Sequence, residues 1–351
     1  MLSAMFAFLV YRSVASPLTL GYPDNRPVAS LRLPARDAGV VLRHGDHPNQ
    51  SDGSGAREAL VYERRGVYYL HYDGAGPSGW QTCLATSRDL IHWEKRDVVL
   101  PLGATGFRDA AGACSPWVIR EGGWWHMFYL GTPNASPAPH FVSMFPYLTL
   151  KARSRSPAGP WEKQYAVIPF ATQTNTYFSV TASPGHVVKH QGEFLMFFSA
   201  ATEDPKVKRT LSISRTKDLN GRWRIDPDPI MPPSEQIENS SLYFEPKNQT
   251  WFLFTKHIGV DEQGFEWTDA IWVYWSTDLN RWDVRNKAVV LDGSNCTWSK
   301  RCIGMPSVIK VGKRLAIFYD APGGESVSHM QRDIGLAWLE LPLVPPAEAR
   351  N

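Results

Sequence analysis

The stretch LATSRDLIHWEKRDVVL (residues 84–100) contains the motif Ser-x-Asp-Leu-x-x-Trp, which returns further along the chain. WSTDLNRWDV (275–284) repeats it, and SRTKDLNGRWRI (214–225) repeats it with one residue added. RSRSPAGPWEK (153–163) is a looser relative. The closing tryptophans are 68, 62 and 59 residues apart, at Trp93, Trp161, Trp223 and Trp282. A motif that recurs at a nearly fixed period indicates a repeat architecture.

Each repeat contains an apolar strand, a short turn and an aromatic strand. The turns contain Gly or Asn and fall at residues 65–66, 122–123, 191–192, 247–248 and 312–313. Such runs joined by short links predict β-hairpins. A third strand, such as QTCLATS or AIWVYWS, and a Trp-bearing outer strand complete each unit. Five such units predict an all-β fold, a five-bladed β-propeller with four-stranded antiparallel blades.

In this arrangement the Asp-Leu-x-x-Trp segment joins the third and fourth strands of a blade. We expect its Asp to cap the turn and its Trp to pack between neighbouring blades. The fifth unit has no such segment after it. Its outer strand is expected from PVASLRLP (27–34) or AGVVLR (38–43), which would leave no edge unpaired. No segment has a linker composition, so residues 17–351 are predicted to form one propeller domain.

Composition narrows the function classes. The chain has 351 residues, of which 43% are hydrophobic and 20% charged, as in packed globular proteins. Its 37 basic and 34 acidic residues form no basic stripe, so no nucleic-acid partner is expected. No run of 18 apolar residues exists, so no membrane span is predicted. The 14 tryptophans suit either a large β core or the faces of sugars.

Two features favour a secreted glycoprotein. Residues 1–16, MLSAMFAFLVYRSVAS, are apolar and end in small residues, like the tail of a signal peptide. Five asparagines begin Asn-x-Ser/Thr sequons: Asn49, Asn134, Asn239, Asn248 and Asn295.

The four cysteines leave two interpretations open. Cys296 and Cys302 enclose the short loop CTWSKRC and would form a disulfide in an oxidising compartment, or they are two free thiols. The cysteines form no CxxC pair and lie near no His cluster, so no metal site is predicted. No cofactor is expected either. A structural cation in the central channel has no support in the sequence.

A propeller presents the starts of its innermost strands around a central funnel. Acidic residues gather just before the predicted first strands, at Asp46, Asp52, Glu58, Asp109, Glu235 and Glu238. Taken singly, a surface carboxylate near a turn is usually only solvated. Several at equivalent places in successive repeats indicate a site.

Some segments resemble a known group of enzymes. SRSPAGPWEK resembles the A-x-S-x-x-G-P-W signature of glycoside hydrolase family 43. REALVYERRGVYYLHY, IENSSLYF and RDIGLAW are similar to blade starts and ends in the five-bladed propeller glycosidases, which include families 32, 43, 62, 68, 117 and 130. The resemblance covers nearly the whole chain and implies three acidic residues, from blade one, blade two and a later blade. The matching positions are Glu58, Asp109 and Glu238.

The chain departs from that pattern in two ways. The first blade of these enzymes usually offers Asp, where this chain has Glu58. The Trp-Met-Asn-Asp-Pro box is missing, which argues against the fructan-active family 32.

Glycosidic cleavage needs one carboxylic acid to protonate the leaving oxygen and one carboxylate to activate water or to attack the anomeric carbon. A third carboxylate raises the pKa of the acid by like-charge repulsion. We expect Glu238 to be the acid, with His257 as the next candidate, Glu58 or Asp46 the base, and Asp109 the residue that tunes the pKa. Acids carried on different blades would leave room for water, which favours inversion. The blades and their funnel acids together favour an exo-acting glycoside hydrolase.

Further residues are candidates for binding a carbohydrate substrate, and each also has a plainer interpretation. The tryptophans would serve as sugar platforms or simply pack, and Arg332 would bind a carboxylate or only pair with Asp333. The candidates are Asp46, Asp52, Trp117, His257, Trp267, Asp320, His329 and Arg332.

Two alternatives to hydrolysis stay open. A glycoside phosphorylase or transglycosidase, as in families 130 and 68, would need a basic cluster in the funnel if phosphate is the acceptor, and only Lys300, Arg301 and Arg332 stand out. A non-catalytic carbohydrate-binding propeller is the other alternative. Facing carboxylates would favour an enzyme, and scattered ones a binding protein. The sequence does not indicate an oligomeric state.

Overall fold

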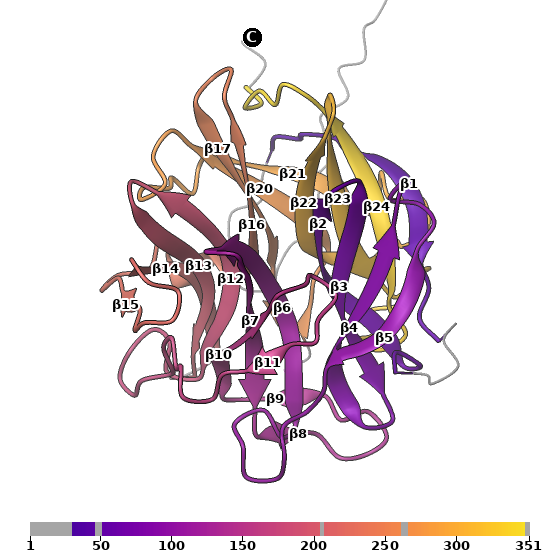
Figure 1. Cartoon of the computed structure of the whole chain (residues 1–351). Helices are drawn as coiled ribbons and strands as arrows, with labels where there is room; N and C mark the ends of the chain where they lie inside the picture. The colour runs from indigo at the N-terminus through magenta and orange to yellow at the C-terminus, as the bar shows by residue number, and fades with distance from the viewer. Residues whose placement is uncertain (1–29, 46–50, 204–206, 261–265, 348–351) are drawn as a thin grey trace, which may run out of the picture.

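The computed structural model describes residues 30–45, 51–203, 207–260 and 266–347 (Figure 1). These residues form β-strands and one turn of 3₁₀ helix, η1 (Pro233–Glu235), so the predicted all-β class is confirmed. No helix among them is long and apolar enough to cross a membrane. The signal-peptide-like segment 1–16, Asp46 and the sequon at Asn49 lie outside the described residues.

The described strands form five antiparallel groups of four. Group one contains β2 (Gly55–Arg64), β3 (Val67–Gly76), β4 (Gly79–Ser87) and β5 (Glu94–Leu100). Group two contains β6 (Gly112–Glu121), β7 (Trp124–Thr132), β10 (Tyr147–Ser154) and β11 (Glu162–Lys163). Group three contains β12 (Thr181–His190), β13 (Glu193–Thr202), β14 (Lys208–Thr216) and β15 (Arg224–Ile225).

Group four contains β16 (Ile237–Glu245), β17 (Thr250–His257), β20 (Ala270–Ser276) and β21 (Lys287–Asp292). Group five contains β22 (Gly304–Val311), β23 (Arg314–Ala321), β24 (Asp333–Glu340) and β1 (Arg36–Leu42). Two small hairpins are inserted, β8 (Asn134–Ala135) with β9 (Ser143–Met144) after β7, and β18 (Gly259–Val260) with β19 (Glu266–Trp267) after β17.

The fourth strand of group five comes from the N-terminal part of the chain. β1 pairs antiparallel with β24, as predicted for AGVVLR, and covers its edge. The preceding segment runs beside β21 instead, where Leu33 N donates to Val289 O (2.9 Å). An N-terminal strand, β1, and a C-terminal strand, β24, are therefore hydrogen-bonded neighbours in the sheet of group five.

The five groups follow one another around a common centre. Their first strands contact each other in the cyclic order β2, β6, β12, β16, β22 and back to β2. Figure 1 shows the indigo first group beside the yellow last group. The inner end of each group therefore faces the same central region, which is where the repeats predicted the functional side chains.

The recurring Trp motif has the structural role predicted for it. Trp93 donates from Nε1 to Leu90 O (2.9 Å), which fixes the ring over its own turn. Asp89 Oδ1 caps that turn by accepting the backbone N–H groups of Ile91 and His92 (2.9 and 2.8 Å). Each motif Trp packs on the second strand of the preceding group. The pairs, with ring-centroid distances, are Trp93–Phe318 (5.8 Å), Trp161–His71 (5.7 Å), Trp223–Phe128 (5.3 Å) and Trp282–Phe197 (6.3 Å).

The core consists of apolar layers between neighbouring groups. One layer joins Leu70 and Tyr72 of group one to Leu336 of group five, and the other neighbouring pairs of groups share similar layers. Fully burying one such side chain contributes about 1.5–3 kcal/mol. The layer between the first and last groups therefore helps to hold the ring of contacts closed.

Of the two interpretations of Cys296 and Cys302, the structure has the two free thiols, and the disulfide is wrong. All four cysteines are buried and free. The side chains of Cys296 and Cys302 have separate partners, because Cys296 Sγ lies 3.5 Å from Tyr319 Oη and Cys302 Sγ lies 3.0 Å from Arg332 Nη1.

Candidate active site

Each first strand carries a β-bulge at an equivalent position, near its inner end. The strand register shifts between residues 57 and 60, 114 and 117, 183 and 186, 238 and 241, and 304 and 307. Four residues at equivalent bulge positions have left-handed backbone conformations, namely Glu58 (φ 49°), Ser115 (φ 49°), Asn239 (φ 63°) and Met305 (φ 59°). Such conformations are uncommon for residues with a side chain and cluster at functional sites, where bulges re-aim side chains. Here they direct side chains of different groups towards one centre.

The bulges are held by the preceding group. In three cases the bulge N–H donates to a side chain at an equivalent position on the second strand of that group. These bonds are Glu58 N to Asp320 Oδ2 (2.9 Å), Ser115 N to Asp73 Oδ1 (2.6 Å) and Asn239 N to Ser199 Oγ (3.0 Å). Between groups two and three this position is Leu130, and the bulge residue it would serve is Pro184, which has no N–H. Between groups four and five the position is Lys256, whose Nζ lies 2.8 Å from Met305 Sδ instead.

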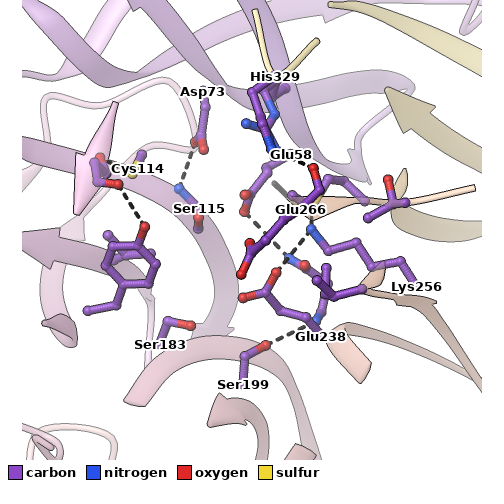
Figure 2. A pocket seen from close by; sticks show the side chains of 18 of the residues that line it. Glu58, Asp73, Cys114, Ser115, Ser183, Ser199, Glu238, Lys256, Glu266 and His329 are labelled. Carbon is purple, nitrogen blue, oxygen red and sulfur yellow. Dashed lines mark hydrogen bonds and ion pairs between the residues drawn. The ribbon is translucent and has the colours of Figure 1, made fainter. Parts of the chain in front are cut away.

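The inner ends of the groups enclose a cavity of about 200 Å³ (Figure 2). Residues from all five groups line it, together with the β8–β9 and β18–β19 segments. It is smaller than the roughly 300–1,000 Å³ of sites for drug-sized ligands, so it suits a ligand about one sugar ring in size. Its charged and aromatic lining residues include Glu58, Asp73, Glu238, Glu266, Arg57, Arg209, Lys256, Arg332, His329, Trp80, Tyr147 and Trp267.

Glu238 is an ionised carboxylate. Its Oε1 accepts from Arg209 Nη1 (2.6 Å) and its Oε2 lies 3.0 Å from Lys256 Nζ. Burial alone would raise its pKa, but the positive charges of Arg209 and Lys256 outweigh burial and lower the pKa to about 2. This low pKa opposes the expected role of Glu238 as the proton donor.

Asp73 has the opposite character. Its side chain is nearly fully buried at the cavity wall. Burial, and next the negative charge of Glu58, raise the pKa of Asp73 well above its usual range, against the hydrogen bond from Ser115 N. The environment of Asp73 therefore favours its protonated form, the form that a proton donor needs.

Glu58 lines the same cavity without an ion pair. Its Oε2 is 3.5 Å from Asn239 Nδ2, and no Lys or Arg nitrogen of the described residues lies within 4.0 Å of its carboxylate. Figure 2 shows Glu58 between Asp73 and Glu238. The cavity thus combines a carboxyl group with a raised pKa, a carboxyl group without an ion pair and a carboxylate held by two cations.

Five of the residues proposed from the sequence meet at this cavity: Glu58, Glu238, Trp267, His329 and Arg332. His329 is exposed at the cavity wall and close to the backbone of Glu266 (Nε2 to O 3.0 Å). Loss of hydration there, and next the positive charge of Arg57, lower its pKa to about 3, so it is neutral. Arg332 pairs with Asp320 (Nε to Oδ1 2.5 Å) rather than with Asp333.

Asp109 and Asp52 do not line the cavity, which corrects the expectation for both. Asp109 is fully buried, accepts from Tyr129 Oη (2.9 Å) and pairs with Lys163 Nζ (2.5 Å). The same set of carboxylate, tyrosine and lysine recurs in Asp52–Tyr72–Lys95 and Glu235–Tyr274–Lys287. Its repetition in three groups marks it as a structural element.

Three further candidates also lie outside the cavity lining. Trp117 packs on the ring of His186 (centroids 5.2 Å apart). His257 is buried and stacks on Trp272 (4.0 Å, interplanar angle 2°), so its side chain does not face the cavity. Asp320 is buried behind the wall, where it holds Arg332 and the Glu58 bulge.

Sequence reasoning missed Asp73, Arg57, Arg209, Lys256 and Glu266. Asp73 and Lys256 lie on second strands, at the register position that Asp320 occupies in group five. The related segments HYDG (71–74) and FYDA (318–321) carried a signal for this position.

Comparisons with known proteins identify the fold. No protein-family model matches the chain, and no curated protein matches it in sequence. The solved structure of the BT0996 RGII complex has a TM-score of 0.69 at 16% identity, with 91% of this chain and 95% of that protein covered. The catalytic domain of a family 62 α-L-arabinofuranosidase from Coprinopsis cinerea gives 0.62 at 13% identity, with 88% and 98% covered. Zg3597, a family 117 glycoside hydrolase from Zobellia galactanivorans, gives 0.58 at 14% identity, with 88% and 91% covered. The chain therefore has the fold of these glycoside hydrolase structures, as its sequence resemblance implied.

Proposed function

We propose that the chain is a glycoside hydrolase and that its five strand groups are the blades of a five-bladed β-propeller, built as one domain around the catalytic cavity. The cyclic contacts of the first strands and the likeness to glycoside hydrolase structures support this proposal. The observation that carries the function is that Asp73, whose pKa is raised, and Glu58 line one ring-sized cavity. Glycosidic cleavage uses two carboxyl groups whose pKa values differ, one as the proton donor and one as the base.

In this mechanism Asp73 is the general acid. Its Oδ1 accepts the Ser115 N–H, so Oδ2 is the oxygen that carries the proton. Oδ2 protonates the glycosidic oxygen as the bond to the anomeric carbon breaks. Glu58 takes a proton from the attacking water, whose oxygen forms the new bond to that carbon. One proton leaves Asp73 and one reaches Glu58, and exchange with solvent restores both.

The electrostatics of the pair follow the same cycle. The negative charge of Glu58 helps to keep Asp73 protonated before cleavage. When Glu58 gains a proton, this repulsion disappears, so Asp73 is left as a stable carboxylate. Glu238, ionised throughout, would accept a hydrogen bond from a sugar hydroxyl and stabilise the positive charge that develops at the anomeric carbon.

The size of the cavity favours exo action. A cavity of about 200 Å³ accommodates a terminal sugar ring rather than several rings of a chain. Trp267, partly exposed at its wall, offers an apolar face of the kind that sugar rings contact. Because Glu58 acts on water in this mechanism rather than attacking the anomeric carbon, the mechanism implies inversion of the anomeric centre.

Phosphorolysis has less support. The cavity holds more basic side chains than the sequence suggested, but most have carboxylate partners. Arg209 pairs with Glu238 and Glu266, Lys256 with Glu238, and Arg332 with Asp320. Phosphate would have to compete with these buried ion pairs.

Secretion is proposed on the sequons. Asn134 and Asn248 are exposed, as an N-linked glycan requires. Treatment of the protein from a eukaryotic host with an N-glycan amidase should shift its mass, and an unchanged mass would contradict the proposal.

The test of the function is a screen of aryl glycosides and of plant, algal and host polysaccharides with three proteins: wild type, Glu58→Gln and the control Glu340→Gln. Glu340 is an exposed glutamate at the end of β24. We expect wild type and the control to release a monosaccharide, and Glu58→Gln to lose about 10²–10⁴-fold in kcat. NMR of the first product should show the inverted anomer. A wild-type protein that cleaves nothing in the screen, or equal activity in Glu58→Gln, would contradict the assignment.

A further inference from the structure

Arg57 lines the cavity with no ion-pair partner. It is the last residue before the Glu58 bulge, and only 9% of it is exposed. No carboxylate oxygen of the described residues lies within 4.0 Å of its guanidinium, and its buried Nε has no hydrogen-bond partner there. Its guanidinium carbon lies 5.3 Å from the ring centroid of Trp80.

The other cations of the cavity are neutralised by the protein. Arg209, Lys256 and Arg332 each form at least one ion pair at 2.5–3.0 Å. Arg57 faces Asp73 across the β2–β3 ladder, but the Asp73 carboxyl bonds to Ser115 N (2.6 Å) instead. The geometry therefore leaves one cavity cation, among the described residues, with unused donors.

A buried charge without a partner is costly, and buried charges in proteins are normally paired. The cation–π contact with Trp80 is worth only about 0.5–2 kcal/mol. It also fixes the guanidinium in place, because the ring supports one of its faces. A preorganised guanidinium with free donors matches an oxyanion, which it binds through two parallel hydrogen bonds.

We propose that Arg57 recognises the carboxylate of a uronic acid residue, so that the substrate is a glycan ending in a uronosyl unit. This inference rests on the proposed function and specifies its substrate class. The cavity holds one ring, and a ring that bears a carboxylate supplies the charge that Arg57 lacks. A neutral sugar would leave Arg57 unpaired.

A carboxylate fits better than a sugar phosphate. Arg57 offers one unneutralised positive charge, and a carboxylate brings one negative charge. The carboxylates of Glu58 and Glu238 line the same cavity and would repel the second charge of a phosphate ester. A sulfate ester also carries one charge, but its oxygens are tetrahedral, whereas the planar carboxylate matches the planar guanidinium.

The kinetic test compares 4-nitrophenyl glucuronides and galacturonides with the matching neutral glucosides and galactosides. The variants are Arg57→Gln, Arg57→Lys and the control Arg314→Gln. Arg314 is exposed and also stacks on a tryptophan, with its guanidinium carbon 4.1 Å from the ring centroid of Trp338, outside the cavity. We expect Arg57→Gln to lose about 10- to 100-fold in kcat/KM on the uronide, far more than on a neutral glycoside. Arg57→Lys should lose less, and the control should match wild type. Equal losses on both substrate types, in a variant that melts like wild type, would overturn the inference.

A binding test separates this inference from the proposed function. Calorimetric titration with free glucuronate, galacturonate, glucose, galactose, inorganic sulfate and inorganic phosphate requires no turnover. We expect a uronate to bind more tightly than its neutral counterpart and the difference to vanish in Arg57→Gln. Uronate binding that depends on Arg57 would support the inference even if no glycoside is cleaved. Neutral glycosides cleaved without uronate binding, or sulfate or phosphate bound through Arg57 more tightly than any uronate, would refute it.

Discussion

Replacing Asp109 by Asn should destabilise the protein and leave its catalytic chemistry in place. Asp109 is fully buried and neutralises Lys163, whose side chain is only 12% exposed. The substitution keeps a hydrogen-bond acceptor for Tyr129 but removes the counter-charge. Breaking a buried pair by neutralising one partner costs about 3–5 kcal/mol, because the other charge stays buried and unpaired.

This cost translates into a measurable melting shift. For a chain of 351 residues the unfolding entropy is about 0.7 kcal/mol/K, so a loss of 3–5 kcal/mol lowers Tm by about 4–7 °C. Thermal unfolding followed by circular dichroism gives Tm, and kcat at 25 °C is measured on the folded fraction. The double variant Asp109→Asn, Lys163→Met should recover much of the lost stability, because no unpaired charge remains. An Asp109→Asn protein with the Tm of wild type and a kcat reduced 100-fold would refute this reasoning and return Asp109 to the catalytic residues.

Three further predictions concern the acid, the thiols and the Trp motif. The kcat/KM on an unactivated glycoside should fall as pH rises through the raised pKa of Asp73, because the acid must be protonated. This fall at alkaline pH should be missing in Asp73→Asn, and a fall that persists in the variant would belong to another group. Titration of the denatured, unreduced protein with a thiol reagent should find four free thiols per chain, and two would show a disulfide. Trp223→Ala should lower the free energy of unfolding by about 3–5 kcal/mol in chemical unfolding, because its buried ring packs on Phe128 of group two, and a loss under about 1 kcal/mol would contradict its role between groups.

The fold could be predicted from local signals that repeat. Hairpin turns such as Arg65–Gly66 and the Trp motif act over a few residues, and the motif returns at a regular period. Trp93 and Trp282 make the same bond to the backbone three residues earlier. All four motif tryptophans share the packing on the preceding group, so one repeat predicts that contact in the others. The pairing of AGVVLR with the last unit followed from the strand that this unit lacked.

The site was predictable only in part, because the bulges decide which side chains reach the cavity. A shift of one residue turns a strand's side chains to the other face, and the sequence does not show where a bulge begins. Glu58 and Glu238 lie at the bulges themselves, and the sequence predicts both as site residues. Asp109 lies six residues before the bulge residue Ser115, too far along the chain for the bulge to direct its side chain into the cavity. Its carboxylate contacts Tyr129 and Lys163 instead. Asp73 was missed because it reaches the cavity from a second strand.

The central claim is that Asp73 supplies the proton for glycosidic cleavage, and a comparison of leaving groups tests it most directly. The measurement is kcat/KM of wild type and Asp73→Asn on two glycosides with the same sugar, one with an alkyl leaving group and one with 2,4-dinitrophenolate. The alkyl leaving group needs protonation and the dinitrophenolate does not. We predict that Asp73→Asn loses about 10²–10⁴-fold on the alkyl glycoside and far less on the dinitrophenyl glycoside. Equal losses on both substrates, or no loss on the alkyl glycoside, would contradict the account.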